Sequence, residues 1–151
     1  MHDFSLRNAQ IKDSEDVFSW RNDPHSRSMF IEQEKVTWET HQNWFKKSLE
    51  NPMRLILIAT SDQKNIAVIR FDFLSTSKNH AVISINLKPE CRGKGIAVPL
   101  LIEAEKFLPK DCSKISAEIK QENSASIKSF ERAGYSITIS GENIVTYTKT
   151  L

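Results

Sequence analysis

The pattern of apolar residues changes abruptly near residue 54, and this change limits what the chain can fold into. Leu55–Ala59 is an unbroken apolar run of strand length, which is typical of a strand buried on both faces. Ile69–Phe73 and Ile83–Leu87 instead alternate apolar and polar residues, as strands with one polar face do. The polar stretch 75–80 between them favours an antiparallel hairpin. The pattern therefore predicts a sheet in the middle of the chain.

A short strand and two amphipathic helices are expected before this sheet. Phe4–Ala9 is typical of a strand. The capping and acidic residues 13–16 precede a helix that carries Val17, Phe18 and Trp20 and should stop by Asp23-Pro24. Thr37 can cap a second helix that ends at Asn51-Pro52. Its side chains at mostly helical spacing are Trp38, His41, Trp44, Phe45 and Leu49.

Helices and strands alternate in the second half of the chain. A helix after Gly95 should bury one side, made of Ile96, Leu100, Leu101, Ala104 and Phe107. A strand near 115–119 follows, and then a short helix from Asn123 to Arg132 that Gly134 ends. Strands at 135–139 and 144–148 flank a turn at 141–143. Together the elements predict an α+β fold, with a mixed, mostly antiparallel sheet of about seven strands and about four helices.

Length and composition favour one globular domain over residues 1–151. The chain has no linker or repeat, and its 151 residues can bury a sufficient core. A formal net charge of +2 leaves no basic footprint for nucleic acid. No apolar run has the length of a membrane span, and the start Met1-His2-Asp3 has no leader character. With two cysteines, Cys91 and Cys112, the expected location is the cytoplasm.

The stretch Leu87–Ala97 has the pattern of an anion site. A strand end runs through Gly93-Lys94-Gly95 into a helix, and Pro99 fits only near that helix start. The N–H groups at a helix N-terminus lack intrahelical partners, and glycines allow a phosphate to approach the main chain. The expected ligand is a pyrophosphate, and the alternative is an ordinary strand-to-helix turn.

A second pattern follows, in which Asn123, Ser126, Phe130, Gly134 and Tyr135 are spaced as Asn-x-x-Ser-x-x-x-Phe-x-x-x-Gly-Tyr. Together with Arg92-x-x-Gly95-x-Ala97, it resembles the GNAT N-acetyltransferase superfamily, whose element order also matches nearly the whole chain. The Gly-x-x-x-x-Gly-Lys-[Ser/Thr] phosphate loop and the Gly-x-Gly-x-x-Gly fingerprint are absent from the sequence. Nucleotide hydrolysis and hydride transfer are therefore disfavoured.

The resemblance implies an acetyl-CoA-dependent N-acetyltransferase with a GNAT-like fold. It gives the backbone amide of Leu87 the catalytic role of polarising the thioester carbonyl. Asn123, Ser126 and Phe130 fall at positions beside the cofactor, although Asn123 also fits a plain N-cap. The pyrophosphate of acetyl-CoA would bind main-chain N–H groups in the loop of Arg92, Gly93, Lys94, Gly95, Ile96 and Ala97.

The groups that move protons are less clear in the sequence. Phe130 stands where many family members carry a tyrosine general acid, so the thiolate must leave without that proton, and water can protonate the sulfur. The strand 82–87 carries no Glu as a base. His41 has a near-neutral pKa that suits proton transfer, and the alternative is a hydrogen-bonded core histidine.

The early helices also indicate an acceptor. Trp20-Arg21-Asn22-Asp23, Arg27, His41-x-x-Trp44-Phe45 and Ile69-Arg70-Phe71-Asp72 resemble the N-acetyltransferases that act on nucleotide-linked amino sugars in pseudaminic acid biosynthesis. The resemblance implies a small-molecule primary amine, bound by Trp20, Arg21, Arg27, His41 and Arg70. For at least two of the three tryptophans, core packing is the favoured alternative.

Other functions stay open. One is acetylation of a peptide N-terminus, as in the ribosomal-protein acetyltransferases, and another is a non-catalytic acetyl-CoA-binding domain. The cysteines and histidines have no zinc-site spacing, so no metal is expected. Cys91 fits an incidental small residue better than a reactive thiol, so we expect direct transfer without an acetyl-enzyme. The chain should act as a monomer or homodimer.

Overall fold

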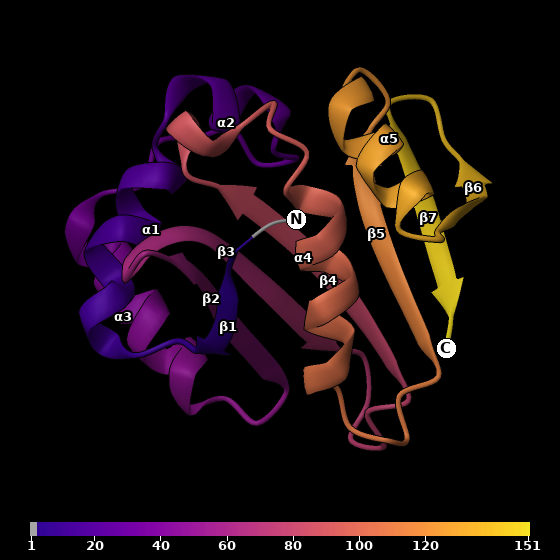
Figure 1. Ribbon diagram of the computed structural model, residues 1–151, viewed down its shortest axis with the longest axis horizontal. Coiled ribbons are helices and arrows are strands. Elements are labelled where there is room, and N and C mark those ends of the chain that lie inside the picture. The colour runs from indigo at the N-terminus through magenta and orange to yellow at the C-terminus, as the bar shows by residue number, and fades with distance from the viewer. Residues whose placement is uncertain (1–2) are drawn as a thin grey trace.

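The computed structural model describes residues 3–151, so the expectation drawn from Met1 and His2 lies outside it. Seven strands form one sheet in the order β1-β2-β3-β4-β5-β7-β6, with α-helices packed around it (Figure 1). All neighbouring strands are antiparallel except β4 and β5. The predicted α+β fold with a mixed, mostly antiparallel sheet is confirmed. None of the helices within residues 3–151 has the length and apolar character that crossing a bilayer requires.

The elements have the following bounds. The strands are β1 (Ser5–Asn8), β2 (Arg54–Ser61), β3 (Lys64–Phe73), β4 (His80–Leu87), β5 (Lys114–Lys120), β6 (Ser136–Ser140) and β7 (Ile144–Thr150). The α-helices are α1 (Ser14–Arg21), α2 (Pro24–Met29), α3 (Trp38–Glu50), α4 (Ala97–Ala104) and α5 (Ser124–Arg132). Short 3-10 helices are η1 (Ile11–Asp13), η2 (Pro89–Cys91) and η3 (Glu105–Phe107).

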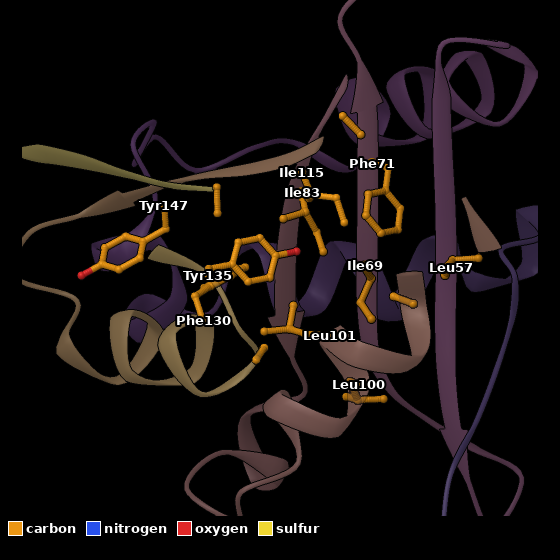
Figure 2. Packing of buried hydrophobic residues seen from close by; sticks show 14 of the residues in the cluster. Leu57, Ile69, Phe71, Ile83, Leu100, Leu101, Ile115, Phe130, Tyr135 and Tyr147 are labelled. Carbon is orange, nitrogen blue, oxygen red and sulfur yellow. The ribbon is translucent and has the colours of Figure 1, made fainter. Parts of the chain in front are cut away.

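Strand β2 lies between two apolar layers. Leu57 and Ala59 belong to the larger core, together with residues of α4. Ile56 and Ile58 instead pack with α1 and α3. Both faces of the strand are covered, as the unbroken apolar run predicts. Figure 2 shows how alternate residues of β3 and β4 extend the larger core toward α5, among them Ile69, Phe71 and Ile83.

Helix α2 is an element that the sequence analysis did not anticipate. Asp23-Pro24 fits a stop signal for α1, yet the Asp23 carboxylate also accepts a hydrogen bond from the Ser26 amide, at 3.0 Å. Pro24 then occupies the first helical position, where its missing N–H is not needed. The same two residues therefore end α1 and begin α2.

The prediction that Phe107 lies on the buried side of its helix is wrong, because this residue is 39% exposed. Helix α4 ends at Ala104, and residues 105–107 continue as a 3-10 helix. Phe107 therefore lies beyond the end of α4, at the last residue of this short segment, and not on the helix that carries Leu100, Leu101 and Ala104.

Candidate active site

The site begins where the two parallel strands of the sheet separate. β4 and β5 are paired at their N-terminal ends, and the last pair is Val82 with Ser116. Beyond this pair the strands diverge toward their C-terminal ends (Figure 1). Among the residues that the structure describes, the second half of β4 therefore keeps its neighbour β3 on one side and has no strand on the other.

The hydrogen-bond register between β4 and β3 decides which backbone groups of β4 face its free edge. At one end of the ladder the Leu74 amide donates to the His80 carbonyl at 3.0 Å, and at the other end the Lys88 amide donates to the Ile66 carbonyl at 2.8 Å. Because hydrogen-bonded pairs alternate in an antiparallel ladder, the even-numbered residues of β4 bond to β3. Beyond the last pair with β5, the N–H and C=O groups of Ile85 and Leu87 therefore point toward the side that β5 has left.

The loop after β4 presents a run of unused amides. Within residues 3–151, the N–H groups of residues 93–98 have no hydrogen-bond acceptor, and the Leu100 amide makes the next bond, to Ile96 O at 3.2 Å. Gly93 and Gly95 have φ values of +72° and +73°, which L side chains rarely adopt. A Cβ built at either glycine meets nothing within 4 Å, so both face open space. This is the arrangement that an anion needs to reach the main chain.

Arg92 differs from the expectation that its amide belongs to this run. Its N–H donates to the Pro89 carbonyl at 3.3 Å. Its guanidinium reaches α2 instead, where Nη2 lies 2.7 Å from the Asp23 carboxylate and also donates to the Ser26 hydroxyl. In the structure, Arg92 therefore connects the anion loop to α2, and its amide is not one of the free amides of the loop.

The second motif lies at the matching end of β5. Asn123 is the N-cap of α5, and its Oδ1 accepts from the Ser126 amide at 3.2 Å. This geometry matches the N-cap alternative and leaves the amide nitrogen of Asn123 for other contacts. Phe130 is buried at 2% exposure and packs edge-on against Tyr135, with ring centroids 5.0 Å apart (Figure 2). Phe130 has no hydroxyl and can supply no proton.

Arginines gather on the α3 side of β3, opposite the α4 core. Arg54 and Arg70 share one carboxylate, Asp72, at 2.6 and 3.0 Å, and both guanidiniums lie over the ring of Trp44. Arg21 donates to a backbone carbonyl, that of Glu32, at 3.4 Å. Burial lowers the pKa of Arg21, Glu32 raises it, and the charge of Arg70 lowers it again. The cluster therefore holds more positive than negative charge.

Two candidate residues lie in the interior instead. His41 is 3% exposed, stands among aromatic rings of α1 and α3, and donates from Nε2 to the Ser14 carbonyl at 3.0 Å. Burial lowers its pKa, the bond to Ser14 opposes this, and the charge of Arg21 lowers the pKa further. Trp20 is 4% exposed. Both placements match the core alternatives that the sequence leaves open for His41 and Trp20.

Arg27 lies on α2, and its Nε atom is buried without a hydrogen-bond partner among the described residues. A surface pocket of about 640 Å³ is bounded by the segment after α2, the end of β5 and the β6–β7 turn. Its lining is Ile31, Lys120, Gln121, Glu122, Asn143 and Ile144. Residues 3–151 contain no group of three or more His, Cys, Asp or Glu side chains that could hold a metal ion.

Sequence reasoning missed the residues that attach α2 to the sheet. Ser26 donates to the Asn86 side chain on β4 at 3.2 Å, and Lys120 at the end of β5 donates to the Ser28 carbonyl at 3.2 Å. These partners are 60 and 92 residues apart in the chain, so local pattern carries no signal for them. The Asp23-Pro24 pair was the available signal, because it also marks a helix start.

The family of this chain follows from a sequence match to a known domain family that covers most of its residues. The acetyltransferase (GNAT) domain family matches residues 3–136. The chain belongs to this family. The order of its elements, the separation of β4 from β5 and the glycine loop before α4 are thus features of a GNAT domain. As a GNAT acetyltransferase, the domain uses acetyl-CoA as its acetyl donor.

Similar proteins agree with this assignment. A Bacillus subtilis (strain 168) protein named "Putative phosphinothricin acetyltransferase YwnH" is 31% identical over 137 residues, which cover 87% of this chain and 83% of the relative. A Vibrio cholerae spermidine N-acetyltransferase in complex with CoA and spermine has a TM-score of 0.87 at 17% identity, covering 98% of this chain and 95% of that one. An aminoglycoside acetyltransferase in complex with coenzyme A has a TM-score of 0.83 at 17% identity, with the same coverage of 98% and 95%. The two structures share the GNAT fold with this chain.

The residues present fit acetyl-CoA. The donor carries a pyrophosphate and an extended arm with amide groups. The amides of residues 93–98 have no acceptors in the described part of the chain, and the two glycines among them face open space. The free edge of β4 offers N–H and C=O groups to an extended chain.

Proposed function

We propose that this GNAT domain transfers the acetyl group of acetyl-CoA directly to the primary amine of a nucleotide-linked amino sugar. The arginine cluster is the observation that supports this acceptor class. Arg54 and Arg70 share the single carboxylate of Asp72, and Arg21, beside them, donates to a backbone oxygen. Guanidinium groups form forked hydrogen bonds with phosphate oxygens, so the excess positive charge suits a diphosphate. Arg27, on α2, belongs to the same acceptor side.

The donor site in this proposal consists mainly of backbone. The amides of Gly93, Lys94, Gly95, Ile96 and Ala97 bind the pyrophosphate at the positive end of α4. The odd-numbered residues in the free second half of β4 pair with the extended arm as an added strand would. Asn123 and Ser126, at the start of α5, line the other side of the arm, while Phe130 is buried in the core and anchors α5.

The chemistry needs few side chains. Bound acetyl-CoA supplies a thioester whose thiol has a pKa of about 8.5 and is a tolerable leaving group. The Leu87 amide, on the free edge of β4, donates to the carbonyl oxygen, where negative charge develops as the amine attacks. The C–N bond forms and the C–S bond breaks. The amine proton passes to water, and water returns a proton to sulfur, since Phe130 lacks a hydroxyl and His41 is enclosed.

An amino sugar suits a site with no strong base. Its amine lies near electron-withdrawing C–O bonds and is less basic than a lysine amine of pKa about 10.4. A larger fraction is therefore neutral and nucleophilic near neutral pH. Water can remove the proton from such an amine after attack.

The test is release of free thiol from acetyl-CoA against a panel of amines. The panel contains nucleotide-linked amino sugars, phosphinothricin, spermidine and peptides with free N-termini. We expect the fastest release with a sugar nucleotide. Arg21→Ala and Arg70→Ala should each raise KM for that substrate about tenfold, equivalent to one charge-assisted contact, with KM for acetyl-CoA unchanged. Lys46→Ala, at an exposed position of α3, is the control.

Other outcomes of this panel would point to a different acceptor substrate. Efficient acetylation of peptide N-termini without release for any amino sugar would support the ribosomal-protein type of activity. Fastest release with phosphinothricin would assign this domain the substrate that its relative is named for. Acetyl-CoA binding with no release for any amine would indicate a non-catalytic domain.

A further inference from the structure

We propose that Arg92 is a positioning residue whose side chain connects the acetyl-CoA loop to α2, so that acetyl-CoA binding orders the amine side of the site. The proposal rests on the proposed function, because it takes the amides after Arg92 as the pyrophosphate site. It adds a route by which one substrate prepares the place of the other. The residues of this route are Asp23, Ser26, Asn86, Arg92 and Lys120.

The first link is an ion pair between segments far apart in the chain. Arg92 Nη2 lies 2.7 Å from Asp23 Oδ2, across a separation of 69 residues. The same Asp23 oxygen accepts the Ser26 amide and so caps α2. The guanidinium of Arg92 is the largest cause that lowers the pKa of Asp23. Arg92 therefore stabilises the charged form of the residue that begins α2.

The second link attaches α2 to both of the diverging strands. Ser26 is buried, and its hydroxyl accepts from Arg92 and donates to Asn86 on β4. Further along, Lys120 at the end of β5 donates to the carbonyl of Ser28. One helix thus touches β4, β5 and the loop after β4, and Figure 1 shows it at the end of the sheet where β4 and β5 have separated.

Helix α2 depends on these contacts for its order. It has six residues, and isolated helices shorter than about 12 residues are marginal in water. Its stability must come from its cap and from its tertiary partners. Arg92 contributes to both, because it binds the cap residue Asp23 and the buried hydroxyl of Ser26.

The coupling follows from the position of Arg92 next to Gly93. Pyrophosphate binding restricts a loop that contains two glycines, and restriction of Gly93 also restricts the adjacent Arg92. Once the loop is fixed by the ligand, the Arg92 side chain loses less conformational entropy when it binds Asp23 and Ser26. Its contacts with α2 are then formed more of the time, and α2 becomes more ordered. Linkage is reciprocal, so an amine that needs ordered α2 should tighten acetyl-CoA binding by the same factor.

Hydrogen–deuterium exchange with CoA as the probe tests the proposal without a known amine. In the parent protein, saturating CoA should slow exchange at residues 93–97 and also, by about fivefold or more, at residues 24–29. In Arg92→Ala and Asp23→Asn the slowing at 93–97 should remain and that at 24–29 should be lost. Arg92→Lys should restore part of it, because a lysine keeps one charged contact to Asp23. Lys106→Ala, which removes an exposed ion pair with Glu103, should behave like the parent.

The results separate this inference from the proposed function. Absence of CoA protection at 93–97 in the parent protein would contradict the pyrophosphate site itself. Protection at 93–97 with none at 24–29, or protection at 24–29 that persists in both Arg92→Ala and Asp23→Asn, would overturn the coupling alone. With the amine identified by the panel, Asp23→Asn should raise KM for the amine several-fold more than KM for acetyl-CoA.

Discussion

Val82 and Ser116 form the last backbone pair between β4 and β5, and the hydroxyl of Ser116 also bonds across the sheet. Its Oγ lies 2.8 Å from His80 Nε2 on β4 and 3.2 Å from Thr148 Oγ1 on β7. Three strands are thus tied together at the end where β4 and β5 still touch. The opposite end is where we place acetyl-CoA.

Ser116→Ala should therefore lower stability and spare donor binding. Loss of a buried hydroxyl with two partners costs about 1–2 kcal/mol, which urea unfolding can measure. Calorimetric affinity for acetyl-CoA should stay at the parental value. A Ser116→Ala protein of full stability, or one with much weaker acetyl-CoA binding, would contradict this division between the two ends of the strands.

Gly95→Ala should weaken acetyl-CoA binding far more than it weakens the fold. The backbone at Gly95 has φ +73°, and an L residue there carries strain of about 1 kcal/mol or more. The new Cβ also enters the open space from which the pyrophosphate must reach the amides. Gly134→Ala is the matched control, because Gly134 also has positive φ, at +101°, but follows the end of α5. Titration calorimetry should show a loss of at least about tenfold for Gly95→Ala and little for Gly134→Ala.

His41 should affect stability in acid rather than the pH dependence of turnover. Its pKa in the folded protein lies below the ordinary value of 6.5, chiefly through burial. As pH falls below that value, the unfolded chain takes up a proton before the folded protein does, so the free energy of unfolding decreases. His41→Gln should flatten this decrease in thermal unfolding, and His80→Gln separates the contribution of His80, whose pKa burial also lowers. A His41→Gln enzyme whose kcat falls at neutral pH and recovers at high pH would restore His41 as the base.

Tyr135→Phe should keep or raise stability. The Tyr135 hydroxyl is buried and has no hydrogen-bond partner within residues 3–151, and burial raises its pKa so that it stays neutral. Removal of such a group relieves a penalty of about 1 kcal/mol, while the edge-to-face packing on Phe130 remains. Tyr147→Phe is the control, since the Tyr147 hydroxyl bonds to Glu131 at 3.2 Å. Urea unfolding should rank Tyr135→Phe at or above the parent and above Tyr147→Phe.

Transfer should proceed without an acetyl-enzyme. Cys91 is partly exposed beside the loop, and Cys112 is buried with its pKa raised by desolvation, which makes Cys112 a poor nucleophile. Cys91→Ala should therefore keep parental activity. Intact-protein mass spectrometry after incubation with acetyl-CoA alone should find no stoichiometric adduct. An adduct that disappeared in Cys91→Ala would establish a covalent route.

Local pattern predicted the elements of the donor side, because they depend on neighbours in the chain. Leu87 at a strand end, glycines at the positive-φ positions 93 and 95, and an asparagine cap at 123 all belong to local rules. The partners of Arg92 and Lys120 lie 69 and 92 residues away, and no period or spacing connects them. The prediction for Phe107 failed because α4 ends at Ala104, and apolar spacing alone does not mark where a helix ends. For His41 the sequence is compatible with either a catalytic base or a core residue. The two differ in the burial of the side chain, which depends on tertiary packing and not on local spacing.

The run of free amides at residues 93–98 determines which substitutions the loop can tolerate. Recognition by main-chain N–H groups makes no demand on the side chain that each residue carries, so Lys94 can be exchanged for many other residues without altering the donors. The demand falls instead on the backbone conformation, which restricts Gly93 and Gly95. The two glycine positions are thereby constrained by the backbone conformation, while Lys94, exposed between them, is not.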